Sequence, residues 1–343
     1  MTWLDLLIAV ACVAGVLGFI SVVALVAIWT ERKISAHIHD RLGPMETGGF
    51  HGWAQTIADM VKLLQKEDII PDAADKPLFK LAPYIVLSAT IASFVVLPFG
   101  AHLIGTDLNI GIYYLVAISS LEVAGILMAG WASNNKWALF GGMRSASQMI
   151  SFEIPIGLSL LIPIMIVGSL SMQDLVGAQA GGFWNWGVFS HLPFAMIAFI
   201  VYFWASLAEV NRTPFDLPEG ESELVAGFHV EYSGMRFAMF FLAEFANMFL
   251  VAGVAVALFL GGWHAPFSFL EISAESNVIL HNLVGFFWFA SKGMVLLFIQ
   301  QWLRWTLPRL RVDQLMHVCW KIFLPFSFVN VLIVSLWIVL TQS

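Results

Sequence analysis

Long apolar runs alternate with polar segments along almost the whole chain. Eight runs come close to the roughly 20 apolar residues with which an α-helix crosses the hydrocarbon core of a bilayer. They are residues 6–29, 81–103, 110–131, 150–168, 189–208, 237–260, 279–302 and 320–340. Only helices and closed barrels satisfy their backbone groups in lipid, and barrel strands are much shorter than these runs. The pattern predicts an all-α polytopic membrane protein with eight transmembrane helices, and a single integral membrane domain over residues 1–343.

The first run resembles a signal peptide only superficially. It is too long for a signal-peptide apolar region, and Glu31, Arg32 and Lys33 follow it where a small-residue cleavage site would stand. We therefore expect this run to be retained as the first span.

Basic residues occupy alternate connecting segments. Those that carry Lys or Arg are 30–80, 132–149, 209–236 and 303–319. Those without either are 1–5, 104–109, 169–188, 261–278 and 341–343. Loops rich in Lys and Arg stay in the cytoplasm, and Asp and Glu count little in this rule. The alternation predicts four cytoplasmic loops and places both termini outside.

The first cytoplasmic loop, 30–80, is too long to be only a connector. Polar side chains occupy the other faces of this segment. The apolar side chains that recur at helical spacing are Trp53, Ile57, Met60, Val61 and Leu64. This spacing predicts an amphipathic helix over 53–66. Such a helix can lie in the membrane interface, and packing beneath neighbouring loops is an equally good interpretation.

Composition excludes several classes of function. The 343 residues are 59% hydrophobic and 11% charged, whereas soluble domains carry about 25% charged residues. The net charge of -7 argues against nucleic-acid binding. Two cysteines, Cys12 and Cys319, cannot hold an iron–sulfur cluster, which takes about four cysteine ligands. No histidine pair inside a run has metal-ligand spacing, and no dinucleotide or phosphate loop occurs. We expect no metal site and no cofactor bound by this chain alone.

An acidic segment, 209–231, separates the fifth and sixth runs. It holds one cation, Arg212, and six carboxylates: Glu209, Asp216, Glu219, Glu221, Glu223 and Glu231. Such a concentration at the mouth of membrane helices is typical of proton, cation or polar-headgroup handling. The alternative is a solvated loop in which Asp216 and Glu219 begin a helix, although this does not account for the later acids.

Further ionisable residues lie inside the apolar runs. They are Glu122, Glu153, Glu244 and Lys292, with Glu209 closing the fifth run at its cytoplasmic end. A charge within the membrane costs several kcal/mol and is a functional candidate by default. Carboxylates at this depth exchange protons near neutral pH, so their number favours a proton relay. The structural alternative is that Lys292 pairs with one of the glutamates.

Several motifs resemble those of one family. They are T-E-R-K (30–33), R-L-G-P (41–44), A-D-M-V-K-L (58–63), K-E-D-I-I-P (66–71), A-G-W-A-S-N-N-K (129–136), S-F-E-I-P (151–155), the acidic block 209–232, F-F-L-A-E-F-A-N (240–247) and P-R-L-R-V-D-Q-L-M-H-V-C-W-K (308–321). In this order they are similar to the H-type membrane subunit of bacterial respiratory complex I (NADH-quinone oxidoreductase), the counterpart of mitochondrial NADH dehydrogenase subunit 1. The resemblance covers nearly the whole chain.

The resemblance implies a quinone-tunnel subunit of a proton-translocating NADH:quinone oxidoreductase. Quinone, expected to be ubiquinone, is the substrate; flavin and iron–sulfur clusters belong to partner subunits. The implied partners are the peripheral-arm subunits with the terminal iron–sulfur cluster, small membrane subunits, antiporter-like subunits and lipid. The implied location is a bacterial inner membrane with periplasmic termini, or alternatively the mitochondrial inner membrane.

The resemblance also assigns roles to residues. Arg32 and Arg41 line or guard the tunnel mouth beside the helix at 53–66. Five acids face the quinone chamber: Asp216, Glu219, Glu221, Glu223 and Glu231. Three acids continue the path into the membrane: Glu153, Glu209 and Glu244. Arg144 and Arg212 balance this path, and no role is assigned to Glu122 or Lys292.

Three rivals remain at this point. A self-contained proton or cation antiporter is disfavoured because no internal repeat is visible. A membrane-bound hydrogenase subunit shares some motifs, but the long 30–80 loop favours the quinone version. A pure assembly scaffold would not need carboxylates at membrane depth.

Overall fold

The computed structural model describes residues 3–218, 220–270 and 277–342, and all regular elements in these ranges are helical. The longer helices are α1 (Trp3–Ile38), α2 (Gln55–Gln65), α3 (Lys76–Phe94), α4 (Gly111–Ala132), α5 (Lys136–Val167), α8 (Phe194–Glu209), α10 (Gly234–Phe259), α11 (Val278–Thr306) and α13 (Leu324–Gln342). The shorter ones are α6 (Met172–Gly177), α7 (Gly187–Ser190), α9 (Glu221–Leu224) and α12 (Val312–His317). A π-helical turn, Val318–Phe323, joins α12 to α13.

Seven helical stretches among the described residues are long and apolar enough to cross a membrane. They are Val10–Ile38, α3, α4, α5, α10, α11 and the joined stretch Val312–Thr341. The fifth predicted run, 189–208, is the one that does not yield a candidate span, because it is divided in the structure. Its first residues belong to α7 and a turn, and α8 itself is apolar but only 16 residues long.

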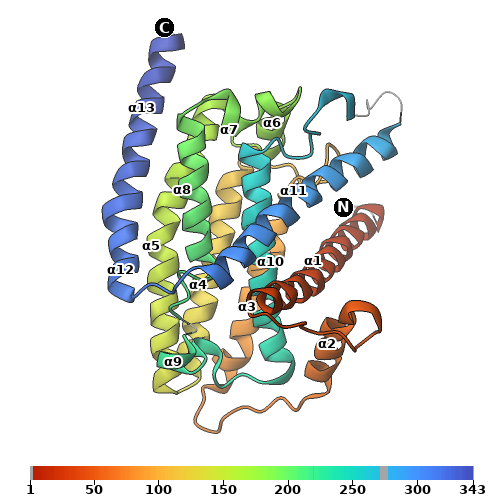
Figure 1. Ribbon diagram of the computed structural model, residues 1–343, viewed down its shortest axis with the longest axis vertical. Coiled ribbons are helices and arrows are strands. Elements are labelled where there is room, and N and C mark those ends of the chain that lie inside the picture. Colours follow the sequence, from red (N-terminus) through yellow and green to blue (C-terminus); the bar gives the residue numbers. More distant parts are fainter. Residues whose placement is uncertain (1–2, 219, 271–276, 343) are drawn as a thin grey trace.

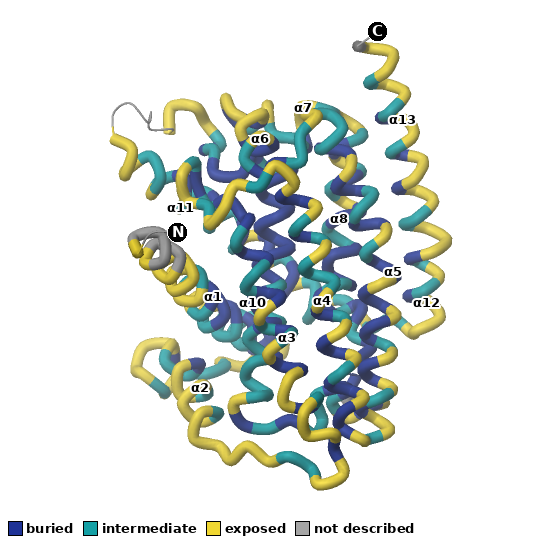
Figure 2. Tube along the Cα trace, turned by 180° about the vertical axis from the view of Figure 1, so that it is seen from behind, coloured by how far each residue is buried: buried dark blue, intermediate teal, exposed yellow. Residues whose placement is uncertain are grey.

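Helix α10 forms the centre of the molecule. Of its most apolar stretch, 78% is buried, against 17–44% for the other candidate spans. Helices α1, α3, α8 and α11 all pack against it. Figures 1 and 2 show α10 enclosed by its neighbours, whereas α13 stands at one edge. Phe245, Phe249 and Phe259 of α10 are fully buried and supply much of the packing.

Helix α5 begins 14 residues before the predicted span at 150–168. The side chain of its N-cap, Asn135, accepts a hydrogen bond from the backbone of Trp137, and Gly168 ends the helix with φ of 78°. These are the capping residues that helix ends favour. The segment 136–149, expected as loop, is therefore helical.

A close backbone contact on α5 positions the turn Gly227–His229. A Cβ added to Gly141 would lie 2.6 Å from the Cα of Gly227. Only glycine allows the turn to approach this closely. The contact places Phe228 and His229 against the central cavity.

Candidate functional site: a charged cavity between the helices

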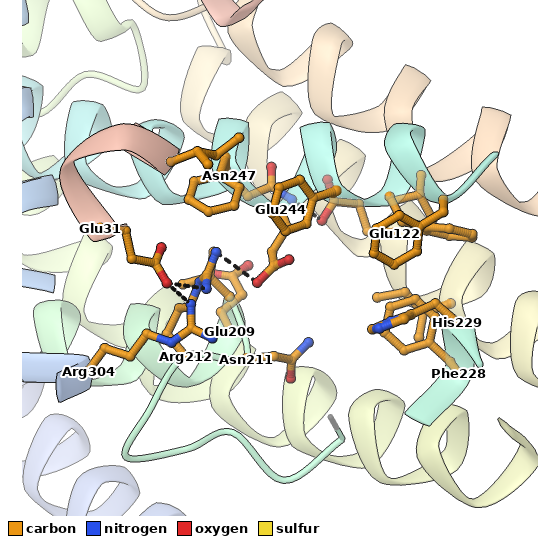
Figure 3. Close-up of a pocket in the computed structure, with 18 of the residues that line it drawn as sticks. Glu31, Glu122, Glu209, Asn211, Arg212, Phe228, His229, Glu244, Asn247 and Arg304 are labelled. Carbon is orange, nitrogen blue, oxygen red and sulfur yellow. Dashed lines mark hydrogen bonds and ion pairs between the residues drawn. The ribbon is translucent and has the colours of Figure 1, made fainter. Parts of the chain in front are cut away.

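A cavity of about 240 Å³ lies between the central helices. Residues of α1, α4, α8, α10, α11 and the turn at 227–229 line it (Figure 3). One wall is aromatic and contains Phe237, Phe240 and Phe241. Its ionisable lining residues are Glu31, Arg32, Glu122, Glu209, Arg212, His229, Glu244 and Arg304.

Four of these side chains form a chain of alternating charge, in the order Arg304, Glu31, Arg212 and Glu244. We call it the buried charge chain because its two central members are buried, whereas Arg304 and Glu244 are partly exposed. Arg212 Nη2 lies 2.8 Å from Glu244 Oε1, and Arg212 Nη1 lies 3.7 Å from Glu31 Oε1. Arg304 contacts the same oxygen of Glu31. Arg212 is 2% exposed and its guanidinium also stands over the Phe245 ring at 4.6 Å.

The alternation of sign explains how these charges are tolerated at depth. Breaking a buried ion pair from one side typically costs about 3–5 kcal/mol because the remaining charge is left uncompensated. Here Glu31 has two cationic partners and Arg212 has two anionic partners. Loss of one contact therefore leaves each of these two central groups with a counter-charge.

Arg32 links the cavity to α2. It lines the cavity, and its Nη1 lies 2.6 Å from Asp59 Oδ2. A helix is present where the amphipathic segment was predicted, and Trp53 and Leu64 beside and within it are 58% and 59% exposed. Arg41, by contrast, is exposed and does not line the cavity.

Glu209 joins the central cavity to a second, smaller one. The smaller cavity, of about 30 Å³, is lined by Glu153, Tyr202 and Glu209 among others. Glu153 also borders an apolar groove between α4 and α5. Glu153 and Glu209 therefore both line the smaller cavity, and Glu209 and Glu244 both line the central one.

Glu122 lies in the cavity wall with neutral partners. Thr90 Oγ1 is 2.6 Å from Glu122 Oε1, and Asn247 Nδ2 donates to Glu122 Oε2 at 2.6 Å. These partners come from α3 and α10. Glu122 itself is 6% exposed.

His229 faces the cavity from outside the membrane helices. Burial lowers the pKa of the His229 imidazole, and the negative charges of Glu244 and Asp216 partly oppose this effect. Asp216 is thus close enough to act electrostatically on the cavity wall, although it does not line the cavity.

Glu223 and Glu231 of the acidic segment do not line the cavity. Arg144 Nη1 is 2.6 Å from Glu223 Oε2 at the surface, and this hydrogen bond lowers the pKa of the Glu223 carboxyl. Glu231 Oε1 accepts a hydrogen bond from Asn135 Nδ2 at 2.6 Å. Glu219 lies outside the described residues, as does the side chain of Glu221.

Sequence reasoning missed three ionisable members of the site. Glu31 stands next to Arg32 in a motif already singled out, so its position at the end of an apolar run was a usable signal. Arg304 was assigned to a loop, but α11 continues to Thr306 and turns this side chain toward Glu31. His229 was treated as one of several scattered histidines, and only the close contact at Gly141 brings its turn to the cavity.

Lys292 lies far from this chain of charges along α11. Its Nζ donates to the backbone carbonyls of Leu260, Gly262 and His264, at 2.7, 3.0 and 2.7 Å. It also stands 4.1 Å from the centre of the Trp186 ring. These contacts satisfy carbonyl groups at the end of α10, where a cation is favoured by the helix dipole.

Within the described ranges, no group of three or more His, Cys, Asp or Glu side chains is arranged to hold a metal ion. The fold and the cavity define a class: a polytopic, all-helical membrane protein with a partly apolar cavity crossed by buried, paired charges.

Comparison with known proteins identifies the family. The family profile described as NADH dehydrogenase matches residues 10–335. The H-type subunit of NADH-quinone oxidoreductase from Chlorobaculum tepidum is 52% identical over 327 residues, covering 94% of this chain and 90% of that protein. The same subunit from Anaeromyxobacter dehalogenans is 49% identical, covering 97% of this chain and 83% of that protein. Its counterpart from Bacteroides thetaiotaomicron is 42% identical, covering 97% and 91% respectively.

The chain therefore belongs to the NADH dehydrogenase family, as a subunit of the NADH-quinone oxidoreductase complex. The other subunits of that complex are its partners, and its apolar helices together with its bacterial relatives indicate an inner-membrane protein.

Proposed function

We propose that this subunit forms the quinone tunnel of the complex and transmits charge from the quinone chamber into the membrane arm. The observation that carries the proposal is the continuity of ionisable side chains around the cavity. Arg32 lies at the α2 side, the buried charge chain crosses the middle, and Glu209 opens toward Glu153. The aromatic wall supplies an apolar surface of the kind that a quinone ring and tail require.

The proposed roles of single residues are those that the family resemblance implies, and the positions of Arg32, Arg212, Glu209 and Glu244 around the cavity support part of them. Arg32 and Arg41 guard the mouth beside α2, which lies in the membrane interface. From the family resemblance, Asp216, Glu219, Glu221, Glu223 and Glu231 face the quinone chamber in the assembled complex, and Glu209, Glu244 and Glu153 continue the path inward. Arg144 and Arg212 balance it, each through contact with an acid of the predicted set. Ubiquinone is the substrate.

The proposed membrane arrangement has eight spans in one domain, and both termini lie on the periplasmic side. These spans are the seven candidate stretches and, in addition, the shorter helix α8. A 16-residue helix is about 24 Å long at 1.5 Å per residue. This is less than the roughly 30 Å of hydrocarbon, and α7 with its following turn extends it. The neighbouring partners are the peripheral-arm subunits with the terminal iron–sulfur cluster, the small membrane subunits and the antiporter-like membrane subunits. The iron–sulfur clusters and the flavin belong to partner subunits.

Glu244→Gln tests the relay in the intact complex. Glutamine keeps the size and hydrogen bonding of glutamate but cannot ionise. Arg212 retains Glu31 in this variant, so we expect normal assembly. NADH:quinone turnover and proton pumping should fall together, whereas NADH oxidation by a soluble artificial acceptor should persist. Glu209→Gln should give a milder loss, because its place at the end of α8 lets water substitute.

The exposed Glu46 provides the matched control, since Glu46→Gln makes the same chemical change away from the cavity. An assembled Glu244→Gln complex with the turnover and pumping of the Glu46→Gln control would remove Glu244 from the relay.

A further inference from the structure

Glu122 differs from the other cavity acids in the chemistry of its partners. Glu31 and Glu244 contact arginines, which only donate hydrogen bonds and remain charged. Glu122 contacts a hydroxyl and an amide, and within the described part of the chain no cation lies in ion-pairing distance of it. An uncompensated charge buried at this depth is expensive. The surroundings therefore favour the neutral carboxylic acid at Glu122.

The hydroxyl of Thr90 can satisfy this neutral acid. Its Oγ1 lies 3.0 Å from the carbonyl oxygen of Val86 as well as 2.6 Å from Glu122 Oε1. A hydroxyl has one hydrogen to donate. When Thr90 donates to Val86, the short contact to Glu122 is satisfied only if the carboxylic acid donates its proton to Thr90.

Both partners also suit the ionised form. Thr90 can rotate its hydrogen from the Val86 carbonyl to the carboxylate. The Asn247 amide donates through Nδ2, and turning it over would present its oxygen to a protonated acid. Neither change moves a backbone atom. Glu122 is thus held by two groups that can donate to it or accept from it, which is what a site for a mobile proton requires.

We propose that Glu122 is a proton-exchange site of the cavity, neutral at rest and held by Thr90 and Asn247. Its carboxyl releases a proton to water in the cavity, becoming a carboxylate, and takes a proton back from that water, while Glu31 and Glu244 remain ionised against their arginines. Thr90 and Asn247 are positioning residues. The contribution of this exchange to turnover rests on the proposed function. The protonation state of Glu122 at rest is independent of the proposed function.

Other charged groups around the cavity influence this exchange. The other charged or titratable residues that line the same cavity are Glu31, Arg32, Glu209, Arg212, His229, Glu244 and Arg304, and Glu153 lies on α5, which packs against the helix of Glu122. Ionisation of Glu122 adds a negative charge to a lining that contains Glu209 and the paired Glu244. The exchange is therefore sensitive to the charge state of Glu209.

Infrared spectroscopy of the purified, resting complex tests the protonation state. The difference between wild type and Glu122→Gln, with isotopically labelled glutamate, should contain the carbonyl band of one protonated carboxylic acid. A difference that contains only carboxylate bands would overturn the proposal, because Glu122 would then be ionised at rest. Quinone and turnover are not needed for this measurement.

Substitution of Thr90 tests the positioning role. An ionised carboxylate gains more from the hydroxyl than a neutral one does, so Thr90→Val should move the titration midpoint of the band upward, by about one pH unit. Thr90→Ser should restore it. Ser93→Ala is the matched control, since Ser93 is a buried hydroxyl on the same helix that donates to the backbone carbonyl of Ala89. An unchanged midpoint in Thr90→Val would overturn the role of Thr90, even if assembly were altered.

Turnover separates this inference from the proposed function. Glu122→Gln should lower NADH:quinone turnover about 100-fold or more in assembled complex, as is typical of a lost proton-transfer group. Full turnover would show that the proton on Glu122 is structural and would overturn the exchange. If Glu122→Gln fails to assemble, Thr90→Val provides the same test. We expect a smaller loss of turnover in this variant, and unchanged turnover would count against proton exchange at Glu122. If Glu244→Gln and Glu209→Gln retain full turnover while Glu122→Gln loses it, the proposed chain fails and Glu122 stands.

Discussion

The buried charge chain makes a quantitative prediction about Arg304. Arg304→Met removes the cation that contacts Glu31 but keeps a long side chain in its place. Glu31 is 8% exposed and retains its ion pair with Arg212 at 3.7 Å. A hydrogen bond to a charged group contributes about 1.5–3 kcal/mol. Because Glu31 keeps one counter-charge and the Arg304 side chain is 23% exposed, we expect a cost of about 2 kcal/mol, less than for a fully broken buried pair.

The assay is the rate at which the complex loses NADH:quinone activity at a fixed elevated temperature. Unfolding of such an assembly is irreversible, so its practical stability is a rate. If the contact is lost before the barrier is crossed, about 2 kcal/mol corresponds to about 30-fold faster inactivation. Lys80→Met is the control, because Lys80 is an exposed cation on α3 away from the cavity. It should change the rate by less than about threefold.

A double-mutant cycle isolates the pair. Glu31→Gln should also accelerate inactivation, since Arg304 and one side of Arg212 lose their partner. Once Glu31 is neutral, adding Arg304→Met should cost little more. We expect the double variant to fall short of the sum of the single effects by about 1–2 kcal/mol, whereas independent sites add within about 0.5 kcal/mol. Additive effects would refute the direct pairing of Arg304 with Glu31.

Three further predictions concern other parts of the chain. The first concerns topology: in a Cys12→Ser background, Asp107→Cys should react with an impermeant thiol reagent added on the periplasmic side, whereas Asp72→Cys should react only after permeabilisation. Labelling of residue 72 from the periplasm would reverse the orientation. The second concerns the tunnel mouth: Arg41→Ala should raise the apparent KM for quinone and leave soluble-acceptor activity intact, and loss of both activities in assembled complex would point to a structural fault. The third concerns the end of α10: Lys292→Met removes the donor of three hydrogen bonds and should lower the stability of the protein by about 3 kcal/mol. We expect less assembled complex, and a wild-type amount would contradict the capping role of Lys292.

Much of the architecture could be predicted from the sequence because its causes are local. A span is a matter of length and hydropathy against the thickness of the bilayer, so the apolar runs predicted helices at most of their positions. The run 189–208 was harder, because its helix begins only at Phe194 and leaves a 16-residue apolar helix. Helix α5 extended beyond its apolar run because a polar segment capped by Asn135 continues the same helix.

The motifs and the family were also readable from the sequence. The order of motifs along the chain predicted the complex I family, and the comparisons confirmed it. The cavity acids Glu209 and Glu244 were recognised because a carboxylate in or at the end of an apolar run is conspicuous against its neighbours.

Only the tertiary structure decided which charges meet. Glu31, Arg212, Glu244 and Arg304 come from distant parts of the chain, and their pairing depends on how α1, α10, α11 and the 209–212 segment pack together. The sequence showed Arg304 only as a basic residue near a helix end. It showed Glu122 as one more intramembrane acid, with no sign that its neighbours are a hydroxyl and an amide instead of an arginine. Hydropathy is a property of each residue and its immediate neighbours, whereas a counter-charge is supplied by whichever helix lies alongside in space.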